Sequence, residues 1–141
     1  MKSRTFHTQS EEDTIALGER LAAELPPKTV VLLIGNLGAG KTTIAKGIVK
    51  GLGAAQPEEV SSPTFTLIHE YSPSVYHIDL YRLDREAQLE TLGLDEIFDR
   101  EAAVLIEWGE KFLNRMPAER IEIRLRATSE NSREIEILAP G

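Results

Sequence analysis

One segment constrains the fold of this chain more than any other, the run of residues 30–43. Five apolar residues, 30–34, precede the pattern G-x-x-x-x-G-K-T, and helix-favouring sequence follows it. A continuous run of leucine and β-branched residues is typical of a strand buried on both faces of a parallel sheet. A glycine-rich turn that leads from such a strand into a helix cradles phosphate groups. The sequence therefore predicts a nucleoside-triphosphate site at this turn.

Each residue type in the turn has a physical role. Glycines permit a backbone path that bulkier residues would strain, and they let backbone N–H groups approach a phosphate chain closely. These donors lie at a helix N-terminus, where the helix dipole attracts anions. Lys41 can reach the β- and γ-phosphates, and the Thr42 hydroxyl can ligate Mg²⁺. The candidate phosphate-binding residues are Gly38, Ala39, Gly40, Lys41, Thr42 and Thr43.

Charge and composition narrow the possible partners. The net charge of −7 disfavours autonomous binding of RNA or DNA, so a role with nucleic acid would pass through a partner protein. The absence of cysteine excludes disulfides, thiolate zinc sites and thiol catalysis. The N-terminal sequence is polar, and no run approaches the length of an apolar membrane span. We therefore expect a soluble, cytoplasmic protein with no membrane association.

Hydrophobic periodicity predicts one α/β domain over residues 1–141. The expected fold resembles that of P-loop NTPases, with a mostly parallel sheet, helices on both faces, antiparallel additions and a C-terminal hairpin. Helices are expected over about 11–24, from 41 to Gly51 or Gly53, over 85–92 and 95–98, and as a short turn at 111–113. Strands are expected over 4–8, 30–34, 66–71, 75–80, 102–106, 121–126 and 134–137.

A phosphate-binding loop needs a carboxylate at the end of a neighbouring buried strand, to hold magnesium directly or through water. Glu107 follows the apolar residues 103–106, which is the form of the second nucleotide-binding motif. We therefore expect Glu107 to serve as a magnesium ligand together with Thr42. The alternative is a carboxylate that merely caps a loop at the end of a strand.

A second strand ends in a more unusual group of side chains. The period of two places His77, Asp79 and Tyr81 on one face. Asp79 could orient the attacking water or act as a general base, and Arg82 could offset charge that builds on the γ-phosphate. A structural role for His77 stays open, as does a covering role for Tyr81 and Arg82.

The hydroxyl-rich segment 61–66 lies where a nucleotide-sensing loop would lie. Hydroxyls of Thr64 and Thr66 can reach the γ-phosphate or the magnesium and release on hydrolysis. Pro63 would stiffen such a loop. An ordinary loop rich in turn-forming residues is the alternative.

The nucleotide is expected to be ATP, because the base-reading pattern N-K-x-D and the switch pattern D-x-x-G of guanine-specific proteins are both absent. A small-molecule kinase would need an acceptor pocket and usually an arginine-rich lid, which the acidic segment 84–101 does not resemble. A nucleotide-gated binding module without useful hydrolysis is the other alternative, because segment 61–66 could act as a switch.

Four blocks of sequence resemble the bacterial TsaE (YjeE) ATPases in order and spacing. They are residues 35–43, the segment S-P-T-F-T at 62–66, the segment H-I-D-L-Y-R-L at 77–83 and the segment L-I-E-W at 105–108. The pattern H-x-D-x-Y-R is far more specific than the phosphate loop, because few P-loop families carry it. The resemblance covers nearly the whole chain.

The resemblance implies an ATPase required for threonylcarbamoyladenosine formation in tRNAs that read ANN codons. In that family the protein works with the TsaD and TsaB proteins and resets their complex between turnovers, and it meets tRNA only through that complex. The resemblance also implies that Thr42 and Glu107 hold Mg²⁺ and that Asp79 serves hydrolysis, so that Lys41 and Asp79 are the candidate catalytic residues. Further nucleotide contacts implied by it are Glu11, Glu110 and Arg133.

Overall fold

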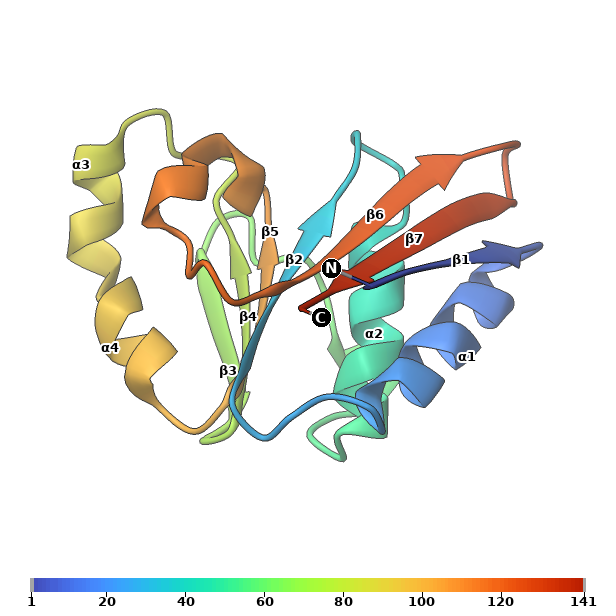
Figure 1. Cartoon of the computed structure of the whole chain (residues 1–141), viewed down its shortest axis with the longest axis horizontal. Coiled ribbons are helices and arrows are strands. Elements are labelled where there is room, and N and C mark those ends of the chain that lie inside the picture. The colour runs from blue at the N-terminus through green and yellow to red at the C-terminus, as the bar shows by residue number, and fades with distance from the viewer. Residues whose placement is uncertain (1, 141) are drawn as a thin grey trace.

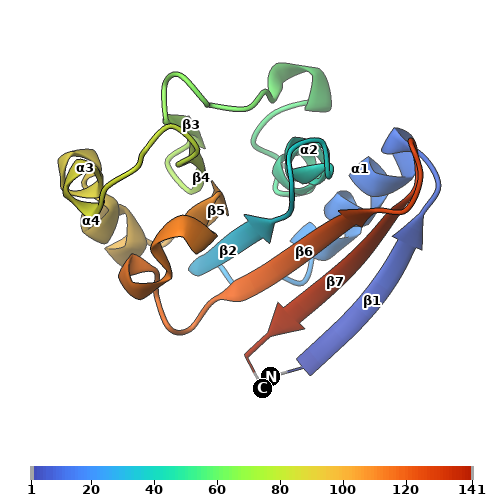
Figure 2. The same ribbon diagram turned by 90° about the horizontal axis from the view of Figure 1, so that it is seen from above.

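A computed structural model describes residues 2–140. Its strands form one seven-stranded mixed sheet in the order β1-β7-β6-β2-β5-β4-β3 (Figures 1 and 2). The central strands β6, β2, β5 and β4 are mutually parallel, and β1, β7 and β3 add at the edges in antiparallel pairs. The strands are β1 (Lys2–Thr8), β2 (Thr29–Ile34), β3 (Ile68–Ser72), β4 (Val75–Asp79), β5 (Ala103–Glu107), β6 (Ile121–Ala127) and β7 (Arg133–Ala139). The predicted fold class is confirmed.

Helices cover both faces of the sheet, with α1 and α2 on one face and α3 and α4 on the other (Figure 2). Strand β2 explains why two layers are needed, because Val31 and Leu33 face α1 and α2 while Val30 and Leu32 face the opposite layer. The α-helices are α1 (Glu11–Ala22), α2 (Lys41–Gly51), α3 (Glu86–Leu89) and α4 (Leu94–Asp99), and the 3₁₀ segments are η1 (Pro57–Glu59), η2 (Glu90–Leu92) and η3 (Gly109–Arg115).

The predicted elements are present, with boundaries that differ by a few residues. Strand β3 begins at Ile68 and not at Thr66, because Leu67 has a left-handed backbone (φ 70°) and donates its N–H to the Pro63 carbonyl. Strand β4 ends at Asp79 and not at Leu80. The Leu80 N–H still bonds to the Glu107 carbonyl of β5, but the Leu80 carbonyl accepts the Leu83 N–H in a turn. Met1 and Gly141, the ends of the predicted domain, lie outside the described residues. Within residues 2–140, no helix combines the length and apolarity needed to cross a membrane.

Helices α1 and α2 pack closely because glycines lie at their crossing. A Cβ atom on Gly47 would lie 2.0 Å from the Ile15 carbonyl oxygen, and one on Gly18 would lie 2.5 Å from the Ile44 carbonyl oxygen. Backbone atoms cannot move aside as a flexible side chain can. The crossing therefore fixes the position of α2, whose first residue is Lys41, over the sheet.

We predict that Gly47→Ala destabilises the fold by about 1–3 kcal/mol through overpacking. Helix propensity alone predicts the opposite sign, since alanine exceeds glycine in a helix interior by about 1 kcal/mol. Urea unfolding followed by circular dichroism measures the change. The exposed substitution Lys50→Ala on the same helix is the control and should change stability by about 0.5 kcal/mol or less. A raised midpoint for Gly47→Ala would contradict the close-packed crossing.

Candidate functional site

The carboxyl ends of β2, β4 and β5 meet the N-terminus of α2 at a cavity of about 680 Å³. Ligand sites commonly have volumes of this size. Most of the residues predicted for the site line the cavity, and the exceptions are Ala39, Thr66, Arg82 and Glu110. Those that line it are Glu11, Gly38, Gly40, Lys41, Thr42, Thr43, Thr64, Asp79, Glu107 and Arg133.

The phosphate loop depends on glycine at two positions. Gly38 and Gly40 have φ values of 80° and 101°, a left-handed region that strains other residues. Arg133 holds the loop from β7, because its Nε donates to the Ala39 carbonyl at 2.9 Å and its Nη2 donates to the Gly38 carbonyl at 3.0 Å. A carbonyl and the next N–H point in opposite directions across a peptide plane. The Gly40 N–H therefore points away from the Arg133 guanidinium.

The Lys41 ammonium is held at the floor of the loop. Its Nζ donates to the Gly35 carbonyl at 2.6 Å and lies 3.5 Å from the centre of the Trp108 ring, within cation–π range. Burial lowers the pKa of Lys41 below its usual value. Three nearby carboxylates act in the opposite direction and raise that pKa: Glu107, Glu110 and Asp79.

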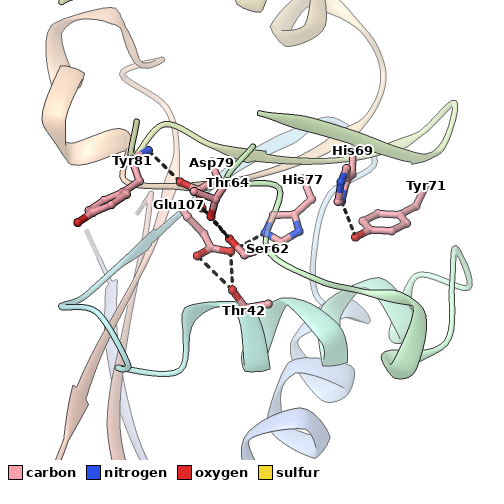
Figure 3. A network of polar contacts seen from close by, with 9 residues as sticks. All are labelled: Thr42, Ser62, Thr64, His69, Tyr71, His77, Asp79, Tyr81 and Glu107. Atoms are coloured by element: carbon pink, nitrogen blue, oxygen red, sulfur yellow. Dashed lines mark hydrogen bonds and ion pairs between the residues drawn. The ribbon is translucent and has the colours of Figure 1, made fainter. Parts of the chain in front are cut away.

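Thr42 and Glu107 face each other across the base of the cavity (Figure 3). The Thr42 hydroxyl donates to Glu107 Oε2 at 3.0 Å and lies 3.3 Å from Oε1. Mg²⁺ prefers oxygen ligands and is usually held by one or two protein groups together with waters and substrate phosphates. A hydroxyl and a carboxylate beside a phosphate loop therefore fit this ion, and Thr42 and Glu107 are the residues that would hold it.

The Asp79 carboxylate accepts hydrogen bonds from residues of two segments. Its Oδ2 accepts from the hydroxyls of Ser62 at 2.7 Å and Thr64 at 3.0 Å, and its Oδ1 accepts the Tyr81 N–H at 2.8 Å. Asp79 thus ties loop 61–67 to the end of β4 (Figure 3). Thr64 lines the cavity, whereas Thr66 does not.

Several residues of the site were not chosen from the sequence. Ser62 bonds to Asp79 and lies in the hydroxyl-rich segment 61–66. The hydroxyl-rich composition of that segment was the one sequence signal that could have indicated Ser62 as a site residue. Trp108 follows Glu107 directly with φ 66°, and this left-handed turn places its ring beside Lys41. Arg82 lies over the exposed Phe65 ring at 5.0 Å and does not line the cavity, so its predicted role at the γ-phosphate finds no support in this geometry.

Glu110 lies behind the site in η3. It is half-buried, and its Oε1 has no hydrogen-bond partner among the residues that the structure describes. Burial raises the pKa of this carboxyl, while its own backbone N–H and the Lys41 ammonium act to lower it. A raised pKa means that the ionised form is the less stable one in the folded protein.

We predict that Glu110→Gln stabilises the protein at pH 8 and not at pH 4. A carboxyl whose pKa is raised by folding lowers the free energy of unfolding once the pH exceeds the pKa of the unfolded state, about 4.3 for Glu. The full loss of stability is present above the pKa of the folded state. Thermal unfolding at both pH values should show a melting temperature higher by a few degrees at pH 8 only. The exposed Glu119→Gln is the control. An equal shift at both pH values would rule out the ionisation as the cause.

Comparisons with known proteins agree on one family. The model of the family "Threonylcarbamoyl adenosine biosynthesis protein TsaE" matches residues 8–135. A relative described as "tRNA threonylcarbamoyladenosine biosynthesis protein TsaE" in Bacillus subtilis is 41% identical, and the alignment covers 100% of this chain and 89% of that protein. A relative with the same description in Haemophilus influenzae is 35% identical, with 99% of this chain and 91% of the other covered.

A solved structure shows the same fold. The crystal structure of Bacillus subtilis YdiB superposes with a TM-score of 0.79 at 37% identity, over 99% of this chain and 87% of that one. The predicted resemblance is therefore confirmed by sequence and by structure. The chain belongs to the TsaE family.

Proposed function

We propose that this chain is a Mg²⁺-dependent ATPase that acts in the threonylcarbamoyladenosine modification of tRNAs reading ANN codons. The observation that carries the proposal is the contact between Thr42 and Glu107 beside Lys41 at the phosphate loop. The descriptions of the relatives supply the pathway, since they name tRNA threonylcarbamoyladenosine biosynthesis. Residues 1–141 would act as one ATPase domain.

In this proposal the phosphate loop binds the triphosphate and Lys41 lies against its β- and γ-phosphates. Thr42 and Glu107 hold Mg²⁺, which offsets charge on the phosphate oxygens when bound. Glu11, Thr43 and Arg133 line the same cavity and would contact the nucleotide. Glu110 lies outside the lining and would act on the nucleotide only through Lys41, whose pKa its charge raises.

Asp79 would handle the attacking water. Its Oδ2 now accepts from both Ser62 and Thr64. If the Thr64 hydroxyl turns to the γ-phosphate, Oδ2 gains a free acceptor position for a hydrogen of the water. Asp79 then orients the water for in-line attack, and loop 61–67 senses whether the γ-phosphate is present.

The partners in this proposal are the TsaD and TsaB proteins, and hydrolysis resets their complex between turnovers. The net charge of −7 disfavours direct contact with tRNA, so tRNA is reached through the complex. The setting would be the cytoplasm.

We predict that phosphate release from Mg-ATP is slow for the protein alone and rises markedly when TsaB and TsaD are added. Lys41→Ala should abolish the rise, because it removes the only charge of the loop that reaches the phosphates. Lys46→Ala on the same helix is the matched control and should retain it. Equal turnover with and without the partners would sink the proposed function.

We predict that Asp79→Asn reduces hydrolysis by about 10²–10⁴-fold, the usual contribution of a positioned acid–base group. Nucleotide affinity should change by less than about threefold, because Asp79 binds loop residues and not the phosphate loop. Single-turnover hydrolysis and fluorescent-nucleotide titration separate the two effects. The exposed Asp84→Asn is the control. Normal hydrolysis by Asp79→Asn would contradict the role of Asp79 at the water. A variant that loses hydrolysis but keeps ATP binding and biological function would instead favour a nucleotide-gated binding module.

A further inference from the structure

A histidine lies fully buried in the centre of β4, where packing alone favours an aliphatic residue. His77 has 0% of its surface exposed and pairs with Leu105 of β5, while Asp79 pairs with Glu107. Residues two apart on a strand share a face, so His77 is directed to the same side of the sheet as Asp79. From this position the imidazole reaches diagonally across to the Glu107 side chain.

The imidazole of His77 makes one hydrogen bond with a described residue. Its Nε2 lies 2.7 Å from Glu107 Oε2 (Figure 3). An ionised carboxylate only accepts hydrogen bonds, so Nε2 carries the hydrogen and donates it. The other ring nitrogen, Nδ1, has no partner among residues 2–140. A buried unpartnered nitrogen costs stability, so packing does not explain why a histidine occupies this position.

The ring of His77 is itself held in orientation from its other side. Tyr71 of β3 stacks on it with ring centres 6.4 Å apart and an angle of 30° between the ring planes. The Tyr71 hydroxyl is in turn 3.2 Å from His69 Nδ1. Full burial and this aromatic neighbour both restrict rotation of the imidazole (Figure 3).

Two donors determine how the Glu107 carboxylate lies. Oε2 accepts from His77 Nε2 and from the Thr42 hydroxyl, and Oε1 lies within reach of that same hydroxyl. A glutamate side chain has three rotatable bonds, and its terminal torsion is broad when nothing holds it. The two bonds at Oε2 restrict this torsion and keep the carboxylate edge beside Thr42.

We propose that His77 is a positioning residue that orients the Glu107 carboxylate for a divalent cation. The proposal rests on the proposed function, because it assigns Thr42 and Glu107 to that cation. Hydrogen-bond partners of metal ligands usually contribute 10- to 100-fold to metal affinity. Loss of the Nε2 donor should therefore weaken cation binding by about that factor, with metal-free nucleotide binding unchanged.

Two substitutions with side chains of similar size distinguish the effect of the Nε2 hydrogen-bond donor from the effect of the space that the His77 side chain fills. In His77→Gln the amide nitrogen takes a place close to that of imidazole Nε2, so the bond to Glu107 is retained. In His77→Met the space is filled and the donor is lost. The Mn²⁺ affinity of the protein with bound ADP is measured by titration, with the electron paramagnetic resonance signal of free Mn²⁺ as the readout. Fluorescent ADP in the presence of EDTA gives the metal-free nucleotide affinity.

The expected result is a 10- to 100-fold weaker Mn²⁺ affinity for His77→Met, an affinity within about threefold of the parent for His77→Gln, and equal EDTA titrations. Equal Mn²⁺ affinity in all three folded proteins would overturn the role of His77 alone. If the parent protein with ADP binds no more Mn²⁺ than ADP alone does, both the role of His77 and the proposed function are contradicted. If His77→Met does not fold, His77→Asn replaces it, because its amide is too short to reach Glu107.

Discussion

The hydrogen bond between Thr42 and Glu107 joins the parts of the molecule on which the site depends. Thr42 lies at the start of α2, whose position is fixed by its close crossing with α1. Glu107 ends β5, which pairs with β2 on one side and β4 on the other. The phosphate loop leaves β2 and enters α2 between them. The bond therefore forms only when sheet register and helix packing are both correct.

The charges around the phosphate loop explain why a bound nucleotide would need a cation beside Thr42 and Glu107. Lys41 faces the carboxylates of Glu107, Asp79 and Glu110, in a chain with a net charge of −7. One ammonium cannot offset these carboxylates and a triphosphate together. Backbone N–H groups and the helix N-terminus supply part of the remaining attraction. A divalent cation beside Thr42 and Glu107 would supply the rest, which is the physical basis of the proposed Mg²⁺ dependence.

Local sequence was sufficient to predict the phosphate loop, the strand that ends in Glu107 and the fold class, because each depends on a short pattern with a fixed geometry. Tertiary contacts were not predictable in the same way. The bond from His77 to Glu107 requires the register of β4 against β5. The path that brings Ser62 to Asp79 requires a left-handed turn at Leu67, which propensity disfavours. Arg133 reaches the loop only through the β6–β7 hairpin.

Both the proposed function and the proposed role of His77 require that Thr42 and Glu107 form a divalent-cation site beside a bound nucleotide. Crystals grown with Mn²⁺ and a non-hydrolysable ATP analogue test it most directly, because anomalous scattering locates the metal independently of the model. We expect an anomalous peak in contact with the Thr42 hydroxyl and beside the Glu107 carboxylate, with the phosphates in the loop that precedes Lys41. A nucleotide bound there with no peak between Thr42 and Glu107, or a peak elsewhere, would contradict it.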